Sequence, residues 1–159
     1  MAFWNSPSKV TLSLRGLSVL FLIASTILLI VDKHSNDYGG INYTYFFSYK
    51  YMFGTGVIGI AYNFLQIISF AICRMLMDND SDVYSLIEFY GDKAVSYILA
   101  TGAAAGFGAI IDLKKIKLYD ADLTGFFNIG YASALLLFLA FLCTAILSIL
   151  SSYALPRKV

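Results

Sequence analysis

Hydrophobic residues in this chain gather into four long runs that are separated by polar segments. The runs place helices approximately over residues 15–31, 52–73, 93–111 and 126–151. Crossing the core of a bilayer takes about 20 helical residues at about 1.5 Å rise each. The second and fourth runs exceed that length and the third is adequate, while the first needs residues 13–16 to reach it. The pattern predicts an all-α membrane protein, a single domain over residues 1–159 built as a bundle of four transmembrane helices.

Composition agrees with a membrane location. Hydrophobic residues make up 59% of the chain and charged residues 13%, with a mean hydropathy of +0.75. A soluble domain of this size cannot hide so many apolar side chains, because apolar atoms already contribute roughly 55–60% of ordinary protein surface. The net charge of +1 gives no basis for binding nucleic acid. Membrane lipids are therefore the expected surroundings, and nucleic acid is not an expected partner.

The first run has an alternative interpretation as a cleaved signal peptide. Lys9 and Arg15 precede a short apolar stretch, as in a secretory signal. The run is followed by Asp32, Lys33 and His34, whereas a cleavage site needs small residues. A retained first helix is therefore favoured.

Two of the runs begin with opposite charges, Arg15 at the first and Asp92 at the third. The first and third helices of an up-and-down bundle run in the same direction, so the two side chains lie at the same membrane face and at similar depth. Unpaired charge is unfavourable inside a membrane, and a salt bridge would relieve it. The alternative is that both charges mark helix ends in the headgroup layer. Lysines and arginines divide almost evenly between the two sides, so charge bias does not fix the orientation.

Small and polar residues form inward-facing stripes at spacings of three and four. The second run carries such a seam at Thr55, Gly59, Tyr62, Gln66, Ser69 and Cys73, and the first run carries one at Arg15, Ser18, Leu22 and Ser25. Lipid offers Gln66 no hydrogen-bond partner, so the seam should face protein. In the third run Gly102 and Gly106 let two backbones approach closely. Packing is the favoured interpretation, within one subunit or between subunits, and a pore lined by the seam is the alternative.

No catalytic residue, metal site or cofactor site is predicted. His34 is the single histidine and has no second histidine or cysteine nearby, which argues against a zinc site or a hydrolytic triad. Two glycosylation sequons begin at Asn42 and Asn79, and they lie on opposite sides of the membrane, so at most one can be used. Asn42 is the candidate if the first loop faces outward.

Three segments of the chain carry motifs that can be compared with known families. Residues 89–105 contain Asp92, a Tyr-Ile pair and then a small-residue run, and residues 51–66 contain a tyrosine and a glutamine. These segments resemble the third and second helices of one known family, the Casparian strip membrane domain proteins and their CASP-like relatives in plants, and Arg15 occupies the place of the first-helix arginine. The first-loop signature of the founding members is missing and the third loop lacks cysteine, so the resemblance is to a CASP-like relative.

The resemblance implies a multi-pass plasma-membrane protein, related to the four-helix MARVEL proteins, with both termini in the cytoplasm. Loops 32–51 and 112–125 are then extracellular and loop 74–92 is cytoplasmic. It also implies homo-oligomers and hetero-oligomers with family members, and a scaffold that organises a membrane domain and recruits cell-wall-modifying enzymes. The arginine and aspartate of the family correspond to Arg15 and Asp92, which the resemblance makes a structural charge pair.

The leading hypothesis is a non-enzymatic plasma-membrane scaffold that oligomerises through small-residue helix faces. The alternative is a small channel or transporter built around the seam from Thr55 to Cys73. A third hypothesis, a claudin-like paracellular barrier, requires a tryptophan and paired cysteines in the first loop, whereas the single tryptophan here is Trp4.

Overall fold

Four long helices dominate the structure. The computed structural model describes residues 7–31, 33–34, 41–42, 47–76, 82–116 and 124–154. The helices are α1 (Pro7–Val31), α2 (Phe47–Leu76), α3 (Asp82–Ile116) and α4 (Thr124–Ala154). Each contains a stretch long and apolar enough to cross a membrane, over Lys9–Val31, Phe47–Ser69, Leu86–Asp112 and Asn128–Tyr153. The prediction of a helical membrane protein with four transmembrane helices is confirmed.

Each helix is longer than the apolar run that predicts it. The largest difference is in α3, which begins at Asp82, so that residues 82–92 form its first turns although hydropathy assigns them to a loop. Hydropathy reports where apolar side chains are dense, whereas a helix continues through polar residues that have no reason to break it. An aspartate is also favourable at a helix start, where the backbone N–H groups are unpaired. This extension brings an additional acidic residue into the bundle.

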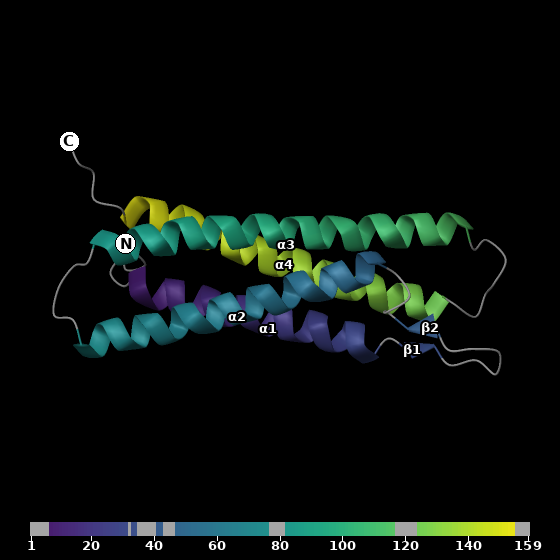
Figure 1. Cartoon of the computed structure of the whole chain (residues 1–159), viewed down its shortest axis with the longest axis horizontal. Helices are drawn as coiled ribbons and strands as arrows, with labels where there is room; N and C mark the ends of the chain where they lie inside the picture. The colour runs from purple at the N-terminus through teal and green to yellow at the C-terminus, as the bar shows by residue number, and fades with distance from the viewer. Residues whose placement is uncertain are drawn as a thin grey trace.

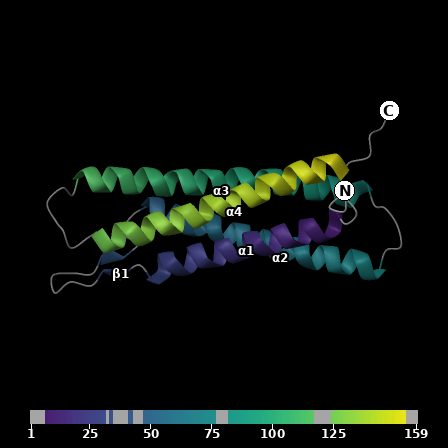
Figure 2. The same ribbon diagram turned by 180° about the vertical axis from the view of Figure 1, so that it is seen from behind.

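The helices form an up-and-down bundle. Figure 1 shows α1 and α3 beginning, and α2 and α4 ending, at the same end of the molecule, and Figure 2 shows the same arrangement from behind. Helices α2 and α4 each pack along both α1 and α3. Helices α1 and α3 therefore lie diagonally across the bundle, and contacts between them have to pass through its interior.

The interior of the bundle is made of side chains from all four helices. Leu22 of α1, Met52 of α2, Leu99 of α3 and Leu137 of α4 are each at most 1% exposed. Large apolar side chains on the opposite faces of α1, α2 and α4 remain exposed, as Leu20, Leu65 and Ile149 illustrate. A bundle that is apolar both inside and outside is suited to a lipid environment.

A short antiparallel hairpin follows α1. It pairs β1 (Lys33–His34) with β2 (Ile41–Asn42), in the register Lys33 to Asn42 and His34 to Ile41. The hairpin lies at the end of the bundle where α1 and α3 end and α2 and α4 begin. The candidate glycosylation residue Asn42 is thus at the end of β2.

Candidate functional site

The structure brings Arg15 and Asp92 together across the diagonal of the bundle. Arg15 Nη1 donates to Asp92 Oδ1 at 3.1 Å and Nη2 donates to Oδ2 at 2.9 Å. The Arg15 side chain is 3% exposed and that of Asp92 is 0% exposed. Such a two-point contact fixes the relative orientation of the two groups as well as attracting them. The pair therefore holds α1 against α3 at a set depth.

Glu88 is a third charged member of this site, which the hydropathy pattern does not predict. Its Oε1 accepts a hydrogen bond from Arg15 Nη2 at 2.8 Å, and its side chain is 18% exposed. One guanidinium is therefore shared by two carboxylates. Glu88 precedes Asp92 by four residues, so the two project from one face of α3 once the helix extends upstream of residue 93. That spacing is the signal that could have identified it.

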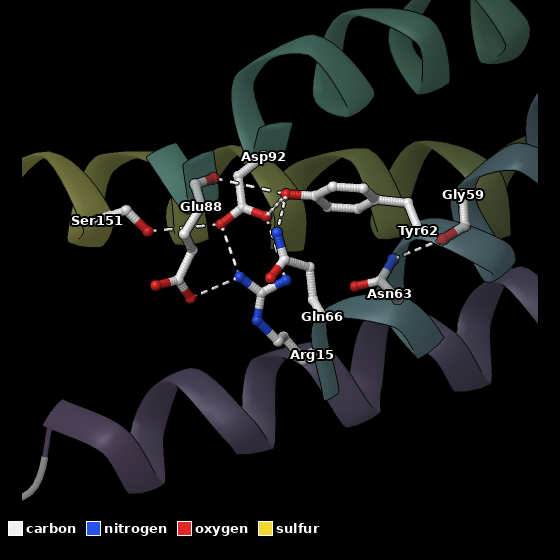
Figure 3. Close-up of polar contacts among 8 residues, drawn as sticks. All are labelled: Arg15, Gly59, Tyr62, Asn63, Gln66, Glu88, Asp92 and Ser151. Carbon is white, nitrogen blue, oxygen red and sulfur yellow. Dashed lines mark hydrogen bonds and ion pairs between the residues drawn. The ribbon is translucent and has the colours of Figure 1, made fainter. Parts of the chain in front are cut away.

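Helices α2 and α4 complete the site. Tyr62 of α2 donates its hydroxyl hydrogen to Asp92 Oδ1 at 2.8 Å and accepts a hydrogen bond from Gln66 Nε2 at 2.8 Å. Ser151 of α4 donates to Asp92 Oδ2 in a longer hydrogen bond of 3.4 Å. We call the set Arg15, Tyr62, Gln66, Glu88, Asp92 and Ser151 the Asp92 network, and Figure 3 shows it converging from all four helices.

The Asp92 carboxylate is saturated by this arrangement. Its two oxygens receive four hydrogen bonds, two from Arg15, one from Tyr62 and one from Ser151. A carboxylate offers about four lone-pair positions, so the bundle uses all of them. A buried charge is tolerated only when it is paired and hydrogen-bonded in this way. A carboxylate with every lone pair engaged is arranged for structural support.

A glycine makes room for the tyrosine. A Cβ atom added at Gly91 would lie 2.5 Å from the Tyr62 hydroxyl oxygen and 2.9 Å from a ring carbon. Because no real Cβ contact is that short, any side chain at residue 91 would displace the ring. Gly91 therefore positions Tyr62 against Asp92.

We expect Tyr62→Phe to lower the free energy of unfolding of the bundle by about 1–2 kcal/mol. The substitution removes one donor from Asp92 and leaves the Gln66 amide without its acceptor, and unsatisfied buried polar groups cost about 1–3 kcal/mol. Unfolding in mixed detergent micelles measures the change. Tyr97→Phe is the matched control, because Tyr97 is 62% exposed and its variant should differ by less than about 0.5 kcal/mol. Equal effects of the two substitutions would show that the Tyr62 hydroxyl contributes nothing.

The small residues predicted for packing mostly lie inside one protomer. A Cβ added at Gly59 would lie 2.9 Å from Leu99 Cδ2 and 3.0 Å from Leu22 Cδ1. At Gly102 it would overlap the Thr55 side chain, and at Gly106 it would lie 2.5 Å from Met52 Sδ. Gly102 and Gly106 therefore bring α3 close to α2 within the bundle.

The polar seam of α2 faces the interior of the bundle only as far as Gln66. Thr55, Gly59 and Gln66 are buried, and Tyr62 reaches the Asp92 network. Ser69 is half-buried, and no residue described beyond Gln66 on α2 is buried. The side chain of Cys73 lies outside the described residues. On α1 the corresponding stripe is buried throughout, and its Ser25 exchanges hydrogen bonds with Ser133 of α4 rather than with α2.

Within the described residues, no three histidine, cysteine, aspartate or glutamate side chains are close enough to hold a metal ion together. Asn42 lies in β2 and its side chain lies outside the described residues, so its use as a glycan acceptor stays a prediction.

Comparison with known proteins identifies the family. The sequence model of the Casparian strip membrane protein domain matches residues 4–143. The chain belongs to the Casparian strip membrane protein family. It is 42% identical to CASP-like protein 4D1 of Ricinus communis over 155 residues, which cover 93% of this chain and 92% of that protein.

Further relatives in this family are equally well covered. Identity is 45% to CASP-like protein 4D1 of Populus trichocarpa, over 93% of this chain and 87% of that protein. Identity is 38% to CASP-like protein 4D2 of Arabidopsis thaliana, over 92% of this chain and 90% of that protein. No solved structure matches the chain. The family is a plant family, as expected from the resemblance, and the part of the chain that its domain matches contains every member of the Asp92 network except Ser151.

Proposed function

We propose that this CASP-like protein is a non-enzymatic scaffold of the plant plasma membrane, whose protomers associate side by side and organise a membrane domain. In this proposal both termini are cytoplasmic, and the end of the bundle that carries the β1–β2 hairpin faces the cell wall. The observation that carries it is the Asp92 network, in which charged groups of α1 and α3 bind one another and polar groups of α2 and α4 complete the cluster. The membership in the Casparian strip membrane protein family supports the same role.

The network favours a structural role for the protomer. It contains the Arg15 guanidinium and two carboxylates, and these groups are engaged with one another and with Tyr62 and Ser151. A transport pathway needs polar groups that can exchange partners with a passing solute. Groups saturated inside a buried cluster instead define one arrangement of the helices. A protomer of fixed shape is what a repeating lateral assembly requires.

The outward face of α3 is the proposed contact between protomers. It carries Ala94, Tyr97, Thr101, Ala104 and Gly108, all exposed and spaced by three and four residues. Along α3 between Tyr90 and Ile111, a stretch described without gaps, Tyr97 is the only exposed large hydrophobic residue. We call these five residues the α3 outer face. Small outward residues allow another helix to approach closely, whereas lipid gains little from them.

A pair of hydroxyl groups, one from α3 and one from α2, lies beside the small residues of this surface. Thr101 and Tyr51 lie on the exterior of the bundle and their hydroxyl oxygens are 2.9 Å apart. The exposed residues of α1, α2 and α4 are mainly large and apolar, for example Ile27, Phe64 and Leu142. Helix–helix contacts in membranes use small residues and hydroxyl groups, while large aliphatic faces suit lipid tails. A second copy, or another member of the family, is the proposed partner on the α3 outer face.

Enzyme recruitment forms the second part of the proposal. The assembled protomers would present their wall-facing segments as a repeated surface, to which cell-wall-modifying enzymes bind. The α3 outer face is then used for assembly, and the wall-facing end for recruitment.

We expect Gly108→Ile to weaken lateral association without unfolding the protomer. A Cβ at Gly108 meets nothing within 4 Å inside the protomer, so a larger side chain projects only toward a neighbour. The dissociation constant should rise about ten-fold, equivalent to about 1.4 kcal/mol. Subunit counting in native membrane patches measures the assembly, and recovery after photobleaching measures lateral diffusion.

Ala61→Ile on α2 is the matched control, because Ala61 is also small, helical and exposed. The proposal requires smaller and faster-diffusing assemblies for Gly108→Ile and unchanged ones for Ala61→Ile. If both variants assemble like the unmodified protein, α3 does not form the contact. If the unmodified protein diffuses as single protomers, the scaffold function itself is wrong.

A further inference from the structure

Two buried oxygen atoms next to the Asp92 network have no hydrogen-bond partner among the described residues. They are Ser18 Oγ of α1 and Asn63 Oδ1 of α2. Both side chains are 0% exposed. The nitrogen of the same Asn63 amide is engaged, because Nδ2 donates to the Gly59 carbonyl oxygen at 2.8 Å. Leaving a buried polar group of this kind unpaired is unfavourable, so a partner is expected for both.

The register of α1 and α2 places these two residues at one depth. On α1, Ser18 lies between Arg15 and Leu22, and on α2, Asn63 lies between Gln66 and Gly59. On the side nearer the middle of the bundle, α1 and α2 contact each other directly, because a Cβ added at Gly59 would lie 3.0 Å from Leu22 Cδ1.

On the other side, Ser18 and Asn63 are flanked by the Asp92 network, to which both Arg15 of α1 and Gln66 of α2 belong. Because α1 and α2 pack against each other in opposite directions, the two residues between these two sets of contacts occupy the same layer. In Figure 3 the oxygen of Asn63 is on the side of its amide that faces Gln66 in that view.

Several other buried hydroxyl groups of the bundle donate to backbone carbonyl oxygens. Ser25 lies two turns deeper on α1 and is 4% exposed. Its Oγ donates to the Ser133 carbonyl oxygen at 2.8 Å, and Ser133 Oγ donates back to the Ser25 carbonyl oxygen at 2.8 Å. Thr55 and Thr144 likewise donate to carbonyl oxygens of their own helices. In the layer of Ser18 and Asn63 two unpaired oxygen atoms instead lie at one depth, which is the property of a site that takes its partner from solvent.

We propose that Ser18 and Asn63 form a buried water-binding site between α1 and α2. The bound water donates one hydrogen bond to Asn63 Oδ1 and forms a second with Ser18 Oγ. Internal waters commonly make about three hydrogen bonds, and a site with two to four polar partners can hold one. Glu88, 18% exposed at the edge of the network, marks the side from which water enters.

Hydration ends at the next layer. Leu22 of α1 and Leu99 of α3 are both 0% exposed and close around Gly59. The site is therefore a dead end, in which water satisfies the polar seam of α2 without crossing the membrane. This inference is independent of the scaffold function, because it concerns one protomer and holds whether or not protomers associate.

Water-edited solid-state NMR of the full chain in lipid bilayers tests the site. In this measurement, magnetisation moves from water to nearby protein atoms. We expect the side-chain signals of Ser18 and Asn63 to build up as fast as that of the partly exposed Glu88. The signal of Ser25 should build up slowly, because its hydroxyl is bonded to protein. In Ser18→Ala the fast transfer to Asn63 should be lost, and in the matched control Ser25→Ala it should be retained.

Two results would overturn the proposal. Transfer to Asn63 in the unmodified protein as slow as to Ser25 would mean that the layer is dry, with the Ser18 hydroxyl turned to the Leu14 carbonyl oxygen of its own helix. Fast transfer to Asn63 that persists in Ser18→Ala would mean that the two residues do not share a water. The first result requires no variant, so a misfolded variant cannot obscure it.

Discussion

Arg15→Leu is expected to lower the free energy of unfolding of the protomer by about 3–5 kcal/mol, the usual cost of removing one partner from a buried ion pair. The substitution leaves Asp92 at 0% exposure without its cation, next to the second carboxylate of Glu88. Two adjacent carboxylates repel each other, and one of them has no access to water. Most of the protein should therefore be lost as aggregate when it is extracted from the membrane, and the yield of monodisperse protein measures that loss.

Two further variants separate the charge pair from a general effect of altering α1. Lys9→Leu removes an exposed cation from the same helix and should change the free energy of unfolding by less than about 0.5 kcal/mol. Arg15→Leu combined with Asp92→Leu should recover part of the stability, because the remaining Glu88 is partly exposed and can be solvated. If the double variant is less stable than Arg15→Leu alone, the pairing of Arg15 with Asp92 does not explain the loss.

Gly102→Ala is expected to destabilise the protomer by about 3 kcal/mol, at the upper end of the usual cost of overpacking. The added methyl group would overlap the Thr55 side chain and lie 2.8 Å from Thr55 Cβ, an atom fixed by the backbone of α2. The contact can be relieved only if α2 and α3 move apart, and that movement would also loosen Met52 against Gly106. Detergent-induced unfolding followed by circular dichroism measures the effect.

Gly108→Ala on the same helix is the matched control for this substitution. No atom of the protomer lies within 4 Å of a Cβ at Gly108, and alanine is the better helix former. The free energy of unfolding of the Gly108→Ala variant should be unchanged or slightly higher. If Gly102→Ala were as stable as Gly108→Ala, the close approach of α2 to α3 through Gly102 would be contradicted.

Much of this fold could be predicted from one sequence, because two physical signals are strong in it. Long apolar runs require membrane-crossing helices, and polar or small residues repeated at spacings of three and four indicate which face avoids lipid. The same reasoning placed Arg15 and Asp92 at one membrane face, since α1 and α3 run in the same direction, and left a salt bridge and separate helix-end charges as alternatives. The family resemblance supplied the biological context that these patterns lack.

Other parts of the site were not predicted, for identifiable reasons. Glu88 was missed because hydropathy assigns its segment to a loop, although the helix extends through it. Ser133 and Ser151 were missed because the buried stripe of α4 that carries them alternates small and polar residues with leucines, so it stands out little from a mainly apolar helix. Gly102 and Gly106 could have packed within one chain or between chains, because a small-residue face satisfies both equally.

The diagonal contact between α1 and α3 also constrains how the protein is made. Arg15 and Asp92 are separated by 77 residues along the chain, and the rest of the first hydrophobic segment and the whole of the second emerge from the ribosome between them. At about 5–20 residues per second, the arginine waits roughly 4–15 seconds for its counter-ion. During that interval the nascent first helix carries an uncompensated cation, which favours retention beside the translocon until the third segment arrives. Biogenesis should therefore proceed by late closure of the bundle rather than by sequential release of finished helices.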